Sequence, residues 1–371
     1  MEREFSRSLS WMFSSMIKLT IYTLILLASS AVSSDELRKV KEVSLNEFDL
    51  QGYGQAILPL SNSNNVLVLL SKFSNKILFI DDTKTKELKL EHDVSSYIQS
   101  KDQIFVIDNS GQLLKITPNS DITVLLQDAD LHGRDFHISS DGKALYTRGL
   151  VIHSPFDSSE HIVKIEDLYP QFHGASFGQR IGITSGAMKH SLDKDTWLDV
   201  WNTETGQKVK SFNTLDHYVY TPTIVDELQG LVMFQWNGNL TLWNYKSDET
   251  LYKKSIKYGF VDVEKIGEVF RAYGQNNIQH LKVEDNQVIR TLLCEFKNST
   301  ILSPPQYTMD GHHALVEESS SEQSRFSIYD ISENGCSKKI ELPDNYDNYT
   351  LHPTKRTVIT SNSKAVNIYS W

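Results

Sequence analysis

The residues best spaced for metal chemistry lie in one acidic segment in the first half of the chain. Oxygen ligands recur there at alternate positions, and a glycine stands where a calcium-binding EF-hand loop turns. The possible ligands of this segment are Asp128, Asp130, His132 and Asp135. The twelfth position, which supplies a bidentate glutamate in an EF-hand, holds Ser139, and no flanking helix is predicted. We therefore favour a solvated acidic loop over a calcium site.

Motifs of common enzyme classes are absent from the sequence. The 12 histidines are scattered and never show the His-Glu-x-x-His spacing of zinc proteases. The sequence also lacks a Gly-x-Ser-x-Gly elbow, a glycine-rich phosphate loop and a Cys-x-x-Cys pair. These absences weaken the hypothesis of an enzyme but do not exclude it, because an active site can be assembled from single residues of several structural units. No cofactor is predicted.

Composition excludes several broad classes of protein. Of the 371 residues, 39% are hydrophobic, which is enough to fill a core and excludes global disorder. Two cysteines cannot build a disulfide-dense scaffold or a cysteine-rich zinc domain. A net charge of -10 argues against a nucleic-acid partner, because phosphate binding needs a basic surface.

The N-terminal region has the composition of an export signal. Residues 17–32 are mostly apolar, small residues follow, and residues 35–39 are strongly polar. We therefore interpret residues 1–34 as a signal peptide, with an uncleaved membrane anchor as the alternative. Cleavage would leave residues 35–371 secreted or in the lumen of the secretory pathway, or in the periplasm or at the cell surface of a bacterium. Contact with a membrane is expected only if the segment stays uncleaved.

Two further features agree with an oxidising, exported location. Acceptor triplets for N-glycosylation begin at Asn298, Asn348 and Asn239, and the first two of these are predicted to lie in loops. Such triplets also arise by chance in a chain rich in Asn, Ser and Thr. Cys294 and Cys336 could form one disulfide, and the sequence leaves both the paired and the free state open.

A short pattern repeats along the chain. Each copy is a strand of alternating apolar residues, an aromatic or acidic residue, a polar turn and a second apolar strand. The copies recur at a mean interval of about 41 residues, which is the period of four-stranded propeller blades. Their first apolar residues are Leu78, Leu113, Val163, Leu198, Leu240, Ile278, Phe326 and Val366. No stretch after the N-terminal segment has apolar residues at the spacing of an amphipathic helix. The pattern therefore predicts one all-β domain over residues 35–371.

The repeats resemble the WD40 family and its extracytoplasmic relatives, which include the YVTN-type propellers. Trp201-Asn202 and Trp243-Asn244 stand where that family has its Trp-Asp dipeptide, and Tyr329-Asp330 is a further variant. Residues 137–145 look like the family's Ser-Pro-Asp-Gly-Lys hairpin, and residues 309–315 and 352–358 look like degenerate versions of it. The resemblance implies a β-propeller.

The ends of the chain suggest how the ring would close. The last copy stops at Trp371 and lacks an outer strand, whereas residues 37–45 alternate apolar and charged residues. Pairing of this N-terminal strand with the last blade would remove an exposed sheet edge. We therefore predict eight four-stranded blades, with seven as the alternative if a weak copy near Leu113 or Ile278 is misread.

Aromatic residues and histidines cluster in the loops that connect one blade to the next. In a propeller these loops lie together on one face of the ring. Tyrosine and histidine side chains on that face suit recognition of a partner, because each combines a large contact area with a polar group. Packing between blades is the alternative role for them. The candidates are Tyr169, Phe172, His173, His217, Tyr218, Tyr220, Tyr346 and Tyr349.

These features together favour a non-enzymatic scaffold, secreted or lumenal, that binds a protein, peptide or glycan through the connecting-loop face. One alternative is a propeller enzyme similar to lactonases or quinoprotein dehydrogenases, with a metal or cofactor at the mouth of the central channel. Another is the same scaffold held in the membrane by its N-terminal segment. We expect a monomeric propeller, alone or within a complex, and the sequence does not identify its partner.

Overall fold

The computed structural model describes most of the chain after the N-terminal segment. The described residues are 37–371 without 47, 49–54, 61–66, 82–83, 101–102, 128–136, 140–142, 148–149, 154–161, 165–171, 188–195, 215–218, 257–258, 267–268, 321–322 and 345. Within these ranges the secondary structure consists of strands, without a helix. The predicted signal segment, residues 1–34, lies outside them. No helix in the described ranges is long and apolar enough to cross a bilayer.

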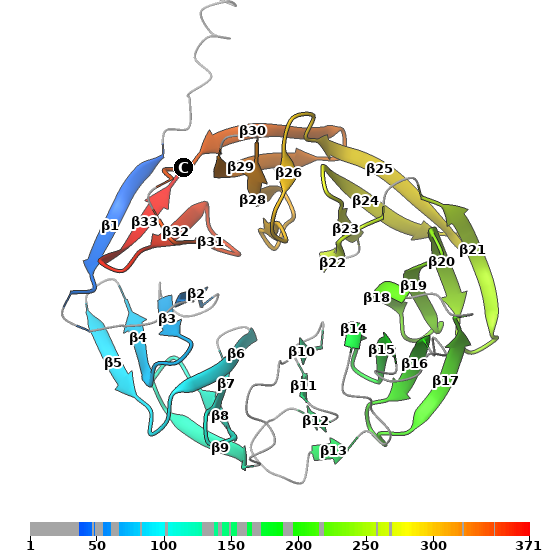
Figure 1. Ribbon diagram of the computed structural model, residues 1–371, viewed down its shortest axis with the longest axis horizontal. Coiled ribbons are helices and arrows are strands. Elements are labelled where there is room, and N and C mark those ends of the chain that lie inside the picture. The colour runs from blue at the N-terminus through cyan, green and yellow to red at the C-terminus, as the bar shows by residue number, and fades with distance from the viewer. Residues whose placement is uncertain are drawn as a thin grey trace, which may run out of the picture. The chain divides into compact units, whose positions relative to one another are not determined.

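The described strands form eight antiparallel sheets, which we number as blades 1 to 8 in chain order (Figure 1). Blades 1 and 2 consist of β2 (Gln55–Pro59), β3 (Leu67–Ser71), β4 (Lys76–Ile80) and β5 (Thr85–Lys89), then β6 (Val94–Ser100), β7 (Gln103–Asp108), β8 (Gln112–Ile116) and β9 (Ile122–Gln127). Blades 3 and 4 consist of β10 (His137–Ile138), β11 (Ala144–Thr147), β12 (Leu150–His153) and β13 (Ile162–Lys164), then β14 (Phe172–Phe177), β15 (Ile181–Ala187), β16 (Thr196–Asn202) and β17 (Lys208–Asn213).

The second half of the chain continues the series. Blades 5 and 6 consist of β18 (Val219–Asp226), β19 (Leu231–Trp236), β20 (Asn239–Asn244) and β21 (Glu249–Ser255), then β22 (Asp262–Ile266), β23 (Val269–Tyr273), β24 (Asn277–Glu284) and β25 (Gln287–Glu295). Blade 7 consists of β26 (Thr300–Ile301), β27 (Gln306–Tyr307), β28 (His313–Ser319), β29 (Ser324–Ser332) and β30 (Gly335–Glu341). Blade 8 consists of β31 (Asn348–Leu351), β32 (Thr357–Ser361), β33 (Ala365–Ser370) and β1 (Arg38–Ser44). The predicted eight-bladed, all-β propeller is confirmed.

The blades stand around a ring, with the first strand of each blade innermost and the fourth at the circumference (Figure 1). Strand β1 pairs with β33 as the outer strand of blade 8, so the two ends of the propeller share one sheet. Just after β1, the Leu45 amide donates to the Lys364 carbonyl at 2.7 Å. The predicted closure by the N-terminal strand is therefore confirmed.

Apolar cores lie between the blades. The described residues contain seven such clusters, and each takes side chains from two neighbouring blades. Because both faces of a blade are covered, a middle strand such as β19 has all of its residues buried and its sequence, LVMFQW, shows no alternation. Each cluster thus stabilises the two blades that it joins.

The tryptophans of the two Trp-Asn dipeptides belong to these cores. Trp201 is buried between blades 3 and 4, and its Nε1 donates to the Thr184 hydroxyl at 2.8 Å. Trp243 is buried between blades 4 and 5, and its Nε1 donates to Oδ1 of Asp248 at 3.3 Å. Both side chains are therefore structural.

Blade 7 departs from the four-stranded pattern. Its innermost strand is replaced by two short segments, β26 and β27, which both pair with β28. Gln306 of β27 bridges to blade 8: its Nε2 donates to the Tyr349 carbonyl at 3.2 Å, and its Oε1 accepts from the Leu351 amide at 2.9 Å. The interruption leaves residues 302–305 outside the sheet.

Packing of β1 against the ring can be tested with two matched valines. Val43 packs against the core between blades 8 and 1, whereas Val40 on the same strand is 62% exposed. We expect Val43→Asp to lower the free energy of unfolding by about 2 kcal/mol, because it places a charge against apolar side chains. Val40→Asp should change it by less than about 0.5 kcal/mol. Equal effects of the two substitutions in denaturant titrations would show that β1 does not pack as described.

Candidate functional site

The structure separates the predicted aromatic candidates into three groups. Tyr169, His217 and Tyr218 lie outside the described residues. Phe172, His173 and Tyr220 belong to inner strands, β14 and β18, and not to the loops before them. Among these three residues the structure describes the side chain of Tyr220, and that side chain is 51% exposed.

Tyr346 and Tyr349 contact other rings where blades 7 and 8 meet. The two hydroxyls of Tyr346 and Tyr369 are 2.6 Å apart, and the Tyr349 hydroxyl donates to the Pro343 carbonyl. The Tyr349 ring stacks on Phe326 with centroids 4.0 Å apart. Tyr349 is buried. It lies on the inner strand β31, where buried and partly buried residues alternate. These contacts match the packing role that the sequence offered as the alternative.

The candidate calcium segment cannot be placed, since Asp128, Asp130, His132 and Asp135 all lie outside the described residues. Elsewhere in the described ranges, His, Cys, Asp and Glu residues form no group of three or more that could hold a metal ion.

The three glycosylation triplets differ in accessibility. Asn298 lies in the turn between β25 and β26 and is exposed. Asn239 begins β20, and its Nδ2 donates to the Asn237 carbonyl at 2.8 Å. Asn348 begins the inner strand β31, where a loop was predicted, and its Nδ2 donates to the Ser361 hydroxyl at 3.4 Å. Asn298 is therefore the most open of the three acceptors.

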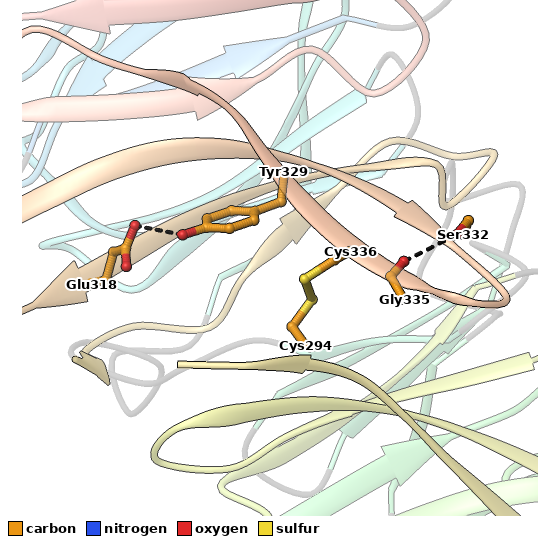
Figure 2. The surroundings of a disulfide bond; sticks show 6 residues. All are labelled: Cys294, Glu318, Tyr329, Ser332, Gly335 and Cys336. Atoms are coloured by element: carbon orange, nitrogen blue, oxygen red, sulfur yellow. Dashed lines mark hydrogen bonds between the residues drawn. A yellow bond between two sulfur atoms is a disulfide. The ribbon is translucent and has the colours of Figure 1, made fainter. Parts of the chain in front are cut away.

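Cys294 and Cys336 form a disulfide, with their Cα atoms 5.3 Å apart (Figure 2). The bond links β25 to β30, the outer strands of blades 6 and 7. Phe296 and Tyr329, which belong to the same core cluster, contact each other edge to face at 5.3 Å between centroids. On the far side of Tyr329, its hydroxyl donates to Oε1 of Glu318 at 2.7 Å (Figure 2). Blades 6 and 7 are thus joined covalently as well as by packing.

A pocket of about 1050 Å³, which we call the seam pocket, lies between the same two blades. Its walls come from the connections before β22 and β26 and from the turns β23–β24 and β28–β29. In an antiparallel blade, these connections and these turns lie at the same end of the strands. The seam pocket therefore lies on the connecting-loop face that the sequence predicted as the binding face. Its lining residues are Gly259, Phe260, Val261, Gln275, Asn276, Phe296, Lys297, Asn298, Ser299, Thr300, Leu302, Ser319 and Ser320.

Hydrogen bonds of the backbone and of side chains hold the walls of the seam pocket in place. The Phe260 amide donates to Oε1 of Gln235 at 2.7 Å, and the Phe260 carbonyl accepts from Nε2 of the same glutamine at 3.0 Å. Across the blades, the Ile301 amide donates to the Gln275 carbonyl at 2.7 Å. The Ser299 hydroxyl donates to Oε2 of Glu318 at 3.1 Å. The pocket is therefore formed before any partner binds.

The chemistry of the lining suits recognition. Among the described lining residues, side-chain amides and hydroxyls alternate with the apolar side chains of Val261 and Leu302, and Lys297 adds an ionisable side chain. These walls offer hydrogen bonds and apolar contacts. Aromatic clustering did not point to this site. Its one sequence signal was the position of residues 259–261 and 296–300 in two successive connecting loops.

The disulfide should stabilise the seam measurably. The disulfide closes a loop between residues separated by 42 positions. From the chain entropy of such a loop, we expect removal of the bond to lower the free energy of unfolding by about 3–4 kcal/mol. We expect a reducing agent to shift the wild-type denaturant midpoint downward and to leave the Cys294→Ser/Cys336→Ser double variant unchanged. Two free thiols in the oxidised, purified protein, counted by mass spectrometry after alkylation, would contradict the bond.

Comparison with known proteins gives the fold a broader context. No protein-family model matches the sequence, and no curated protein is significantly similar to it. Among solved structures, the chain is similar to the C-terminal WD40 domain of Sif2 (TM-score 0.60, 10% identity, 91% of this chain and 99% of that one). It is also similar to the Dos1 propeller (0.57, 13%, 90% and 95%) and to the computationally designed protein Ika8 (0.58, 11%, 87% and 98%). In fold, the chain is an eight-bladed, WD40-like β-propeller.

Proposed function

We propose that this propeller is a non-enzymatic scaffold that binds a segment of a partner protein in the seam pocket. The observation that carries the proposal is the pair of exposed apolar residues on its walls. Val261 is 56% exposed and Leu302 is 53% exposed, and both border a preformed hollow on the connecting-loop face. Exposed apolar side chains rimmed by polar groups are typical of protein interaction sites.

The polar lining favours a peptide segment over a glycan. Gln275 and Asn276 each carry an amide that can both donate and accept, which matches the N–H and C=O groups of an extended backbone. Val261 and Leu302 would contact apolar side chains of the same segment. A glycan would satisfy the amides and hydroxyls but would leave these two residues with few apolar contacts.

The exported location is part of the proposal. Three features support it: the signal-like residues 1–34, the exposed acceptor Asn298 and the disulfide between Cys294 and Cys336. Disulfides form and persist in oxidising compartments and are rare in the cytosol. A propeller in the secretory pathway or outside the cell would present the seam pocket to partners there.

Two leucines of nearly equal exposure provide a matched test of the binding face. Leu302 borders the seam pocket, whereas Leu292 lies on the outer strand β25 and is 54% exposed. Tagged wild-type protein, Leu302→Asp and Leu292→Asp would be purified with cross-linking from the native compartment, and the captured proteins would be quantified. We expect Leu302→Asp to reduce capture of a specific partner at least about 10-fold, because it places a charge in an apolar contact.

Leu292→Asp should capture the same partner at the wild-type level. A partner retained equally by both variants would place binding outside the seam pocket. Loss of the partner from the wild-type protein after enzymatic removal of glycans from the lysate would assign the pocket to a glycan. A catalytic turnover supported by the pocket would contradict the scaffold.

A further inference from the structure

One of the three glycosylation triplets forms part of the wall of the seam pocket. Residues 298–300 read Asn-Ser-Thr and run from the turn after β25 into the start of β26. All three of these residues line the pocket. An acceptor for a glycan and a candidate binding site therefore share one connecting loop.

The exposure of this triplet suits the attachment of a glycan. Asn298 and Thr300 are the two residues that define the acceptor, and both are exposed. Ser299 between them is partly buried, and its hydroxyl donates to Oε2 of Glu318 at 3.1 Å. The middle of the triplet is thus tied to blade 7, while the side chain that would carry the glycan is open to solvent.

The other two triplets lack this combination. The triplet at Asn239 ends on Thr241, which is fully buried, and Nδ2 of Asn239 donates to the Asn237 carbonyl at 2.8 Å. Asn348 and Thr350 belong to the inner strand β31 and border a different cavity, whose walls include inner strands of blades 1, 2 and 7. A bulky glycan on β31 would have to lie among these inner strands. The structure therefore accommodates a glycan at Asn298 better than at either other position.

Two exposed apolar side chains border the same pocket. Val261 is 56% exposed and Leu302 is 53% exposed, and Leu302 follows Asn298 by four residues. Exposed apolar side chains attract unrelated proteins as well as a specific partner. A bulky, hydrated glycan at the rim would screen them from large surfaces and would leave a narrow way into the pocket.

We propose that Asn298 is N-glycosylated and that its glycan restricts the seam pocket to a narrow peptide segment and excludes folded domains. The attachment itself does not depend on the proposed function, whereas the restriction of the partner rests on it. The glycan thus determines which kind of partner reaches Val261 and Leu302.

The modification needs one co-reactant, an oligosaccharide joined to a lipid diphosphate in the secretory pathway. Nδ2 of Asn298 forms a C–N bond to the anomeric carbon of the sugar, and the bond from that carbon to the diphosphate oxygen breaks. Nδ2 loses one proton, and the lipid diphosphate leaves with the electron pair of the broken bond. The transfer is a substitution in which nothing is oxidised or reduced.

Peptide mass spectrometry of the mature protein, purified from its native compartment, tests the attachment. An amidase that releases N-glycans converts each occupied Asn into Asp, so the converted positions record where glycans were attached. We expect conversion at Asn298 and none at Asn239 or Asn348. An unmodified Asn298, or a glycan at Asn348 in its place, would overturn the proposal.

Two substitutions at the third position of the triplet separate the glycan from the side chain that carries it. Thr300→Ala removes the hydroxyl and should abolish the glycan while Asn298 stays in place. Thr300→Ser keeps a hydroxyl and should keep the glycan. Because Thr300 is exposed, both variants should fold as the wild type does.

Labelling of a thiol placed in the pocket tests the shielding without a known partner. The two cysteines of the chain are joined to each other, so Leu302→Cys supplies one reactive thiol. It would be treated with a small maleimide and, separately, with a maleimide carried on a folded protein. We expect the protein-borne reagent to react at least about 10-fold more slowly than in the Leu302→Cys/Thr300→Ala double variant, because an N-linked glycan is bulky. The small reagent should react equally with both.

Leu292→Cys is the matched control, because Leu292 is 54% exposed on the outer strand β25 and does not line the pocket. Its labelling by either reagent should not depend on Thr300. Equal rates at Leu302→Cys with and without the glycan would overturn the shielding. If these rates differ as expected but Leu302→Asp captures the partner at the wild-type level, the shielding stands and the proposed function fails.

Discussion

The structure depends on one constraint: a sheet that is apolar on both faces must have a neighbour on each side. Every described core cluster joins two adjacent blades, so no blade can bury its side chains alone. In a row of blades the first and the last would each expose an apolar face. Closing the ring removes both faces, and pairing β1 with β33 fixes the closure by placing strands from the two ends of the domain in one sheet.

The seam between blades 6 and 7 carries two distinct features, a disulfide and a pocket. At the circumference the disulfide joins β25 to β30, and an apolar cluster lies inside it. At the connecting-loop end, Leu302 falls in the interruption between β26 and β27 and borders the seam pocket. The covalent link and the seam pocket thus occupy different parts of the same interface.

The fold could be predicted from the sequence because the repeat period and the alternation within strands are properties of the chain itself. The closing strand could be predicted for the same reason, since residues 37–45 alternate apolar and charged residues. The site could not, because the seam pocket is built from short loop segments of two blades, polar and apolar, that carry no motif. Tyr349 was a candidate by type alone, and only the register of β31 shows that it is buried.

Closure of the ring by β1 is the central claim, and residue-resolved hydrogen exchange of β33 tests it most directly. In a strand paired on both sides, successive amides point alternately toward the two neighbours. If β1 pairs with β33 as described, the amides of Ala365–Ser370 that point toward β1 should exchange as slowly as those that point toward β32. Fast exchange at every second amide of this strand, at the rate of an exposed sheet edge, would contradict the closed ring.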